Sequence, residues 1–203
     1  MSIKNIVFDF GQVLVHYEPE YMTGVYVTSE ADKALLQKVV FDRLYWDRLD
    51  AGTIDDDEVI SECKKRLPEH LWDVAEKIYY NWIYNIPEVE GMRELIIYLK
   101  DNYDVKLYLL SNISKYFAEH KGEISILSLL DNCVFSGPLG IVKPNKEIFE
   151  YLCNTYSLIP GECIFVDDNT ANINSANSFG INAYLFDGDV ERLKKYLEEA
   201  LKQ

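Results

Sequence analysis

Short apolar runs alternate along the chain with longer segments of helical periodicity, and this alternation is what most restricts the fold. The apolar runs span 6–8, 105–110, 163–166 and 181–186, with a weaker one at 133–135. Apolar residues recur at helical spacing over 92–99, 148–152 and 190–201. Short apolar strands separated by helices are typical of a parallel sheet covered on both faces. The pattern predicts an α/β fold with a Rossmann-like parallel sheet.

The segment between the first apolar run and Pro87 shows no convincing strand. Capping pairs predict helix starts at Ser29 with Asp32 and at Thr53 with Asp56. Apolar positions at helical spacing over 71–82 indicate another amphipathic helix. The chain is therefore expected to consist of two parts. Residues 1–15 and 87–203 form an α/β core, and residues 16–86 form an inserted helical cap subdomain.

Polar residues follow the apolar runs. They are Asp9 and Gly11 after the first run, Ser111 and Asn112 after the second, Lys143 in a glycine-rich loop, and Asp167, Asp168 and Asn169 after a later run. Ligands of open parallel sheets bind beyond the carboxyl ends of the strands. Three carboxylates, a hydroxyl and a lysine are thus expected to converge on one rim of the sheet.

Each of these residues also has an ordinary structural interpretation. A single aspartate at a strand end, such as Asp9, is often a turn residue, and a lone lysine usually lies on the surface. Capping of the next helix explains Asp168 or Asn169, but not the adjacent Asp167–Asp168 pair. Two neighbouring carboxylates repel each other unless a cation or a lysine offsets their charge. Mg²⁺ fits, because it prefers oxygen ligands.

Charge and cysteine usage exclude several classes of function. Twenty basic and 34 acidic residues give a net charge of −14, which disfavours nucleic-acid binding and electrostatic attachment to membranes. The four cysteines are scattered and form no metal-ligand pattern. The N-terminus lacks a signal-peptide pattern, and no run approaches 18 apolar residues. These features predict a cytoplasmic protein.

Taken together, the four polar segments that follow the apolar runs resemble the ordered motifs of the haloacid dehalogenase-like hydrolase superfamily. The matching segments are Val7-Phe8-Asp9-Phe10-Gly11, Leu110-Ser111-Asn112, Val142-Lys143-Pro144 and Phe165-Val166-Asp167-Asp168-Asn169. Single motifs of this length are weak signals, whereas four in the family's order are strong. The helical block at 16–86 falls where this superfamily carries a cap over its active site.

The resemblance implies a Mg²⁺-dependent phosphatase acting on a small phosphorylated metabolite. Asp9 is then the nucleophile that forms an aspartyl-phosphate. Mg²⁺ is held by Asp9, the Gly11 carbonyl and Asp168, with Asp167 behind them, although the two aspartates can exchange roles. Ser111 and the Asn112 backbone bind phosphoryl oxygens, and Lys143 neutralises charge on Asp9 and phosphate.

One position departs from the family pattern. Most phosphatases of this family carry a second aspartate two residues after the nucleophile, as general acid and base, and here that residue is Gly11. Three interpretations remain open. The enzyme can act on phosphates with good leaving groups, as in a similar bacterial branch that includes glucose-1-phosphate phosphatases. The chain can be a catalytically weak or inactive phosphometabolite-binding protein, or, least favoured, a haloacid dehalogenase, which needs no metal.

The cap sequence does not identify the substrate. Trp46 can stack on a sugar ring or belong to the core, and Arg43 can bind a ligand or form a surface ion pair. His16 and Tyr17 lie close to the predicted junction of core and cap. The oligomeric state is left open.

Overall fold

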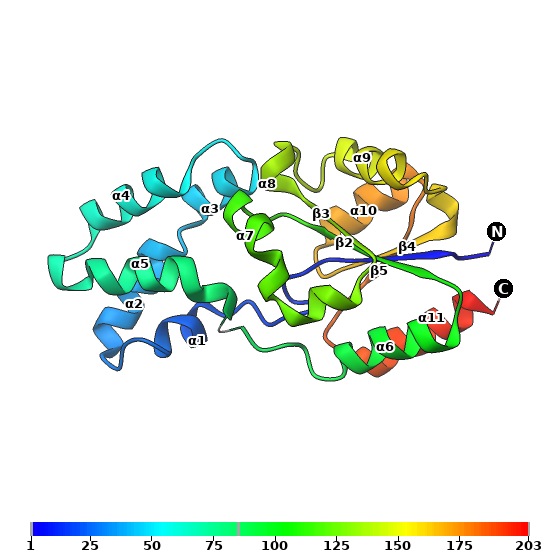
Figure 1. Ribbon diagram of the computed structural model, residues 1–203, viewed down its shortest axis with the longest axis horizontal. Helices are drawn as coiled ribbons and strands as arrows, with labels where there is room; N and C mark the ends of the chain where they lie inside the picture. The colour runs from blue at the N-terminus through cyan, green and yellow to red at the C-terminus, as the bar shows by residue number, and fades with distance from the viewer. Residues whose placement is uncertain (1, 85, 203) are drawn as a thin grey trace.

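A five-stranded parallel sheet forms the centre of the computed structural model, which describes residues 2–84 and 86–202 (Figure 1). The strand order is β3-β2-β1-β4-β5, and all neighbours pair in parallel. The strands are β1 (Asn5–Phe8), β2 (Lys106–Ser111), β3 (Asn132–Phe135), β4 (Cys163–Asp167) and β5 (Asn182–Leu185). Residues 1, 85 and 203, which fall within the predicted subdomain ranges, lie outside the described part.

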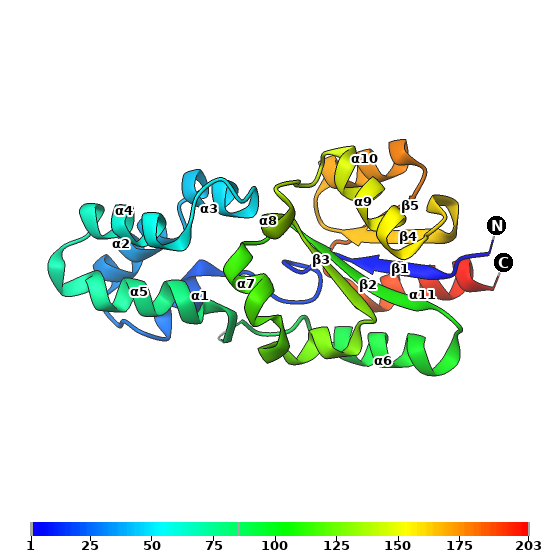
Figure 2. The same cartoon turned by 45° about the horizontal axis from the view of Figure 1, so that its top comes forward.

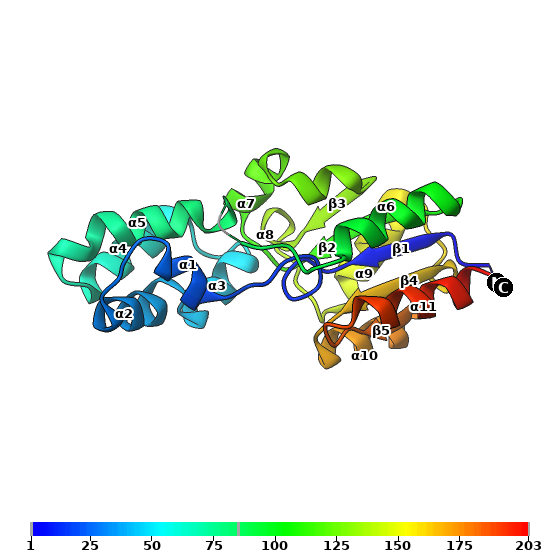
Figure 3. The same cartoon turned by 90° about the horizontal axis from the view of Figure 1, so that it is seen from below.

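Helices cover both faces of the sheet (Figures 2 and 3). One face carries α6 (Met92–Asn102) and α11 (Val190–Leu201), and the other carries α9 (Lys146–Tyr156) and α10 (Thr170–Phe179). Side chains of β1 alternate between the two resulting cores, because successive residues of a strand point to opposite faces. Ile6 and Phe8 belong to one hydrophobic cluster and Val7 to the other. The predicted α/β fold class is confirmed.

A group of helices follows β1 and lies beyond the carboxyl ends of the strands, at the left of Figure 1. We call them the cap helices: α1 (Pro19–Gly24), α2 (Glu30–Val40), α3 (Arg43–Asp50), α4 (Asp56–Arg66) and α5 (Trp72–Asn81), with the 3₁₀ turns Glu69–Leu71 and Trp82–Tyr84. The remaining helical segments are α7 (Lys115–His120), α8 (Ser136–Leu139) and the 3₁₀ turns Lys121–Glu123, Ser125–Leu129 and Pro160–Glu162.

Two local predictions were wrong. The helix expected to start at Thr53 begins at Asp56, because the carboxylate of Asp55 accepts the backbone N–H of Glu58. The glycine-rich segment before Lys143, expected to be a loop, begins with the short helix α8. The other capping prediction is confirmed, since the Ser29 hydroxyl accepts the backbone N–H of Asp32.

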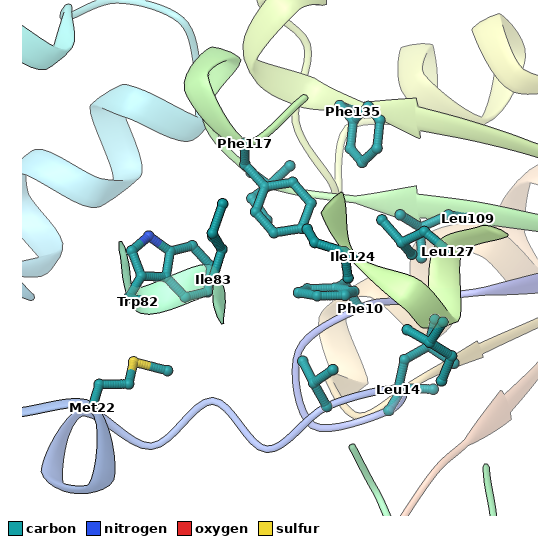
Figure 4. Packing of buried hydrophobic residues seen from close by; sticks show 14 of the residues in the cluster. Phe10, Leu14, Met22, Trp82, Ile83, Leu109, Phe117, Ile124, Leu127 and Phe135 are labelled. Atoms are coloured by element: carbon teal, nitrogen blue, oxygen red, sulfur yellow. The ribbon is translucent and has the colours of Figure 1, made fainter. Parts of the chain in front are cut away.

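Aromatic side chains join the sheet to the cap helices (Figure 4). The ring of Phe117 lies 4.9 Å from that of Phe10, two residues after β1, and 5.7 Å from that of Trp82, directly after α5. All three side chains are buried. This packing fixes Phe10, and with it the neighbouring Asp9, at the boundary between core and cap. None of the described helices has both the length and the apolar character needed to cross a membrane.

Candidate active site

Lys143 connects two of the predicted aspartates at the carboxyl ends of the central strands. Its ammonium nitrogen lies 2.7 Å from Asp9 Oδ1, after β1, and 2.7 Å from Asp167 Oδ2, at the end of β4. The lysine is only 4% exposed, so it is not the ordinary surface lysine that sequence alone allows. A buried cation with two carboxylate partners is compensated for the loss of its hydration.

The adjacent aspartates have different surroundings. Asp167 is fully buried, and its carboxylate also accepts hydrogen bonds from the Asn169 backbone N–H and the Asn172 side chain. Asp168 is exposed and lines the pocket described below. The Asn169 side chain caps α10 by accepting the backbone N–H of Ala171. Capping is thus performed by Asn169, which leaves the Asp168 carboxylate available.

Ser111 and Asn112 lie beside this group at the end of β2. Ser111 is buried. The Asn112 side chain donates to the Lys143 carbonyl at 2.8 Å and accepts the Lys143 backbone N–H at 2.7 Å. This reciprocal pair positions the loop that carries the lysine. The structure therefore gives the Asn112 side chain a holding role that the motif alone did not predict.

Burial and neighbouring charges shift the ionisation of these groups. Burial raises the pKa of Asp9 to about 6, although Lys143 opposes the shift and Asp167 adds to it. Burial and the charge of Asp167 raise the pKa of Asp168. Burial opposes the charge on Lys143, but the two carboxylates outweigh it and raise the pKa of the ammonium. Crowded carboxylates with a single lysine are a site where added positive charge is favourable.

The donor set fits a divalent cation. One carboxylate oxygen each from Asp9, Asp167 and Asp168 lie within 4.8 Å of one another. Oxygen-only ligands of this kind suit Mg²⁺. Of the three, Asp167 is already occupied by Lys143, Asn169 and Asn172, whereas Asp9 and Asp168 face the pocket.

A pocket of about 210 Å³ opens over this cluster. Every predicted site residue except Asp167 lines it: Asp9, Gly11, Ser111, Asn112, Lys143 and Asp168. The backbone of Gly11 is outside the left-handed region, and a Cβ atom there would meet only Tyr17 Cβ, at 3.8 Å. The turn therefore has room for a side chain at residue 11, and the missing carboxylate is not explained by backbone strain or crowding.

Comparison with known proteins identifies the family. A sequence profile described as haloacid dehalogenase-like hydrolase matches residues 3–180. The chain belongs to this family. A D-ribitol-5-phosphate phosphatase from Bacteroides thetaiotaomicron is 29% identical over 197 residues, which cover 90% of this chain and 91% of that protein.

Solved structures of haloacid dehalogenase-like enzymes share the fold. A predicted hydrolase from Porphyromonas gingivalis superposes with a TM-score of 0.71 at 22% identity, covering 97% of this chain and 98% of the other. An enzyme from B. thetaiotaomicron, in complex with magnesium and inorganic phosphate, superposes with a TM-score of 0.72 at 20% identity. The match covers 95% of this chain and 99% of the other. The predicted family is confirmed, and the sequence relative supports the predicted enzyme class, a phosphatase.

The cap helices and the segment just before α1 also line the pocket in this haloacid dehalogenase-like hydrolase. Their side chains in the pocket are Tyr17, Arg43, Trp46, Asp50 and Trp82. Trp46 is mainly a core residue, since it is 6% exposed and its indole N–H donates to the Val40 carbonyl. Arg43 forms an ion pair with Asp47 and also reaches the pocket, and Tyr17 lines it while His16 does not.

Asp50 was not singled out from the sequence. It is the last residue of α3 and shares that helix's buried face with Trp46 and Leu49. The signal was present, because residues 46, 49 and 50 follow the helical i, i+3, i+4 spacing and an aspartate at such a position is a polar group on an apolar face.

Proposed function

We propose that this hydrolase is a Mg²⁺-dependent phosphatase that cleaves the phosphate ester of a small sugar or polyol through an aspartyl-phosphate on Asp9. The observation that carries the proposal is the buried Lys143, which contacts Asp9 and Asp167, while Asp168 in the same cluster has no ion-pair partner among the described residues. The small pocket suits a phosphorylated metabolite. The relative from B. thetaiotaomicron is a phosphatase of D-ribitol 5-phosphate, which supports a polyol or sugar phosphate as substrate.

Each residue has a role that follows from its position. The Asp9 carboxylate attacks phosphorus, the bond to the leaving oxygen breaks, and water later releases phosphate from Asp9. Ser111 and the backbone of Asn112 bind the phosphoryl oxygens, and Lys143 stabilises their charge. Asp9, Asp168 and the Gly11 carbonyl would hold Mg²⁺, and Asp167 would orient Lys143. When bound, Mg²⁺ supplies positive charge between the carboxylates and the phosphate.

The same cluster favours a phosphatase over a haloacid dehalogenase. Dehalogenation through an aspartate needs no metal, and in that chemistry three carboxylates within 4.8 Å of one another would only repel. A bound cation makes the arrangement useful. Ser111, the Asn112 backbone and Lys143 also line one pocket, where they can bind the three oxygens of a phosphoryl group.

The test is a substrate panel assayed with Mg²⁺ and with EDTA. We expect release of phosphate from D-ribitol 5-phosphate or a related sugar phosphate, loss of activity in EDTA and recovery with Mg²⁺. Asp9→Asn should abolish turnover while circular dichroism stays unchanged, because the amide keeps the shape but loses the nucleophile. Turnover near wild type in this variant, or in EDTA, would contradict the mechanism. Phosphate binding without turnover would favour an inactive binding protein.

A further inference from the structure

Within the described part of the chain, Asp50 is a buried carboxylate without a partner. It is 9% exposed, and no hydrogen bond or ion pair among those residues involves its side chain. Yet every fully covered polar side-chain atom in that part of the chain has a hydrogen-bond partner. The Asp50 oxygens must therefore be open to the pocket that the residue lines. Burial without pairing is costly for a carboxylate, which makes a structural role a poor explanation.

The location of Asp50 matches what the pocket lacks. Gly11 lines the same pocket and has no side chain to protonate a leaving group. Among the described residues lining the pocket, Asp50 is the one carboxyl contributed by a cap helix, while Asp9 and Asp168 come from strand ends. The leaving group of a bound phosphate ester points away from the attacking Asp9, since the displacement is in line. The cap helices lie beyond the carboxyl ends of the strands, and Asp50 is the carboxyl group that they bring to the pocket.

Burial makes Asp50 a usable acid at neutral pH. Burial raises its pKa to about 7, Asp47 and Asp9 add to the shift, and Arg43 and Lys143 reduce it. Tyr17 is a further titratable group that interacts electrostatically with Asp50. An acid–base group is most effective when its pKa is close to the working pH.

We infer that Asp50, from the cap, is the general acid and base that replaces the aspartate missing at residue 11. As Asp9 forms its bond to phosphorus, the bond to the leaving oxygen breaks and that oxygen takes the proton of Asp50. A water molecule then attacks the aspartyl-phosphate and gives its proton to Asp50, which restores the starting state. The inference rests on the proposed function. It also fits a phosphate of a primary alcohol, whose poor leaving group needs protonation.

The experiment compares leaving groups in Asp50→Asn, with kcat/KM as the readout of the first phosphoryl transfer. For D-ribitol 5-phosphate or another alkyl phosphate cleaved by the wild type, we expect kcat/KM to fall about 10²–10⁴-fold. For p-nitrophenyl phosphate, whose leaving group needs no proton, kcat/KM should change less than about threefold. A burst of one equivalent of nitrophenolate is expected, because hydrolysis of the aspartyl-phosphate has lost its base.

Two further variants separate chemistry from structure. Asp57→Asn removes an exposed aspartate of the neighbouring α4 and should leave both substrates unaffected. Gly11→Asp, added to Asp50→Asn, should restore part of the alkyl phosphatase activity, because residue 11 has room for a side chain.

Three results would overturn the inference. They are equal losses of kcat/KM on the two substrates, no loss on either, or a loss confined to KM, which would make Asp50 a hydroxyl-binding residue. An inactive wild type would instead overturn the proposed function, and this inference with it.

Discussion

Asp167 and Asp168 are adjacent and chemically identical, yet the end of β4 gives them opposite environments. Asp167 is the last strand residue and is buried against Lys143 and Asn172, whereas Asp168 is exposed at the pocket. The sequence predicted that the pair belongs to the site, but not which aspartate is free. That difference depends on Lys143 and Asn172, which the fold brings to Asp167.

The pair should therefore respond differently to removal of charge. In EDTA at neutral pH, Asp167→Asn should lower the free energy of unfolding by about 2 kcal/mol, because Lys143 loses a charged hydrogen bond but keeps its second partner, Asp9. Asp168→Asn should not be destabilised, since it relieves repulsion between neighbouring carboxylates. Denaturant titration of both variants measures this, and isothermal titration with Mg²⁺ should show weak binding for Asp168→Asn. Equal stability losses would disprove the assignment.

Asp50 should make stability depend on pH. Its pKa is raised from 3.8 to about 7 in the folded state, so the folded protein binds this proton more tightly than the unfolded chain. Ionised Asp50 therefore lowers the free energy of unfolding. This loss of stability is absent below about pH 4, grows as pH rises, and levels off above pH 7 at roughly 4 kcal/mol or less. Asp50→Asn should thus stabilise the protein at pH 8 and have little effect at pH 4. Unfolding curves against pH test this, and a pH-independent difference would contradict it.

At the scale of elements, the long periodic segments were predictable and the short irregular ones were not. The helices α6, α9 and α11 follow from apolar residues at 3.6-residue spacing. The four-residue α8 has no such pattern, and long-range contacts hold it. The Ser136 hydroxyl accepts the Ile113 backbone N–H, and the Gly137 N–H donates to the Ile113 carbonyl. Thr53 and Asp55 compete as caps, and the sequence does not show which side chain reaches the backbone.

The loop after α3 comes close to the backbone of α8 at Gly52. Gly52 has φ +65°, and a Cβ atom there would lie 2.4 Å from the Gly137 carbonyl oxygen. A side chain at this position must push the loop away from α8, and Asp50, two residues earlier in the chain, would move with it. Gly52→Ala should therefore lower kcat/KM for an alkyl phosphate at least about tenfold and destabilise the fold by about 1–2 kcal/mol.

Gly122→Ala is the matched control for this change. Gly122 lies in a 3₁₀ turn outside the left-handed region, and a Cβ atom added there would meet no described atom within 4 Å. Steady-state kinetics and denaturant unfolding of both variants provide the measurements. Wild-type kinetics in Gly52→Ala would show that the close approach of loop and α8 does not position the pocket.

At the scale of the whole molecule, the hydrophobic core does not stop at the cap. One cluster of buried residues includes Leu36 and Ile78 from the cap helices together with Ile6 and Leu95 from the core. The sequence showed the helical block as an insertion but could not show this continuity, because Phe10, Trp82 and Phe117 meet only after folding. The division into 16–86 and the remaining core therefore stays a prediction about the chain's organisation.

Denaturant unfolding can test whether the cap, residues 16–86, unfolds independently of the α/β core. All three tryptophans, Trp46, Trp72 and Trp82, lie within 16–86, so fluorescence reports the cap while far-ultraviolet circular dichroism reports the whole chain. Because the buried cluster is continuous, we expect the two denaturant transitions to coincide, as in a two-state process. Phe117→Ala removes the ring between Phe10 and Trp82 and should cost about 3–5 kcal/mol. In that variant fluorescence should change at lower denaturant than circular dichroism, since the cap loses its anchor. Separate transitions already in the wild type would mean that the cap folds independently of the sheet.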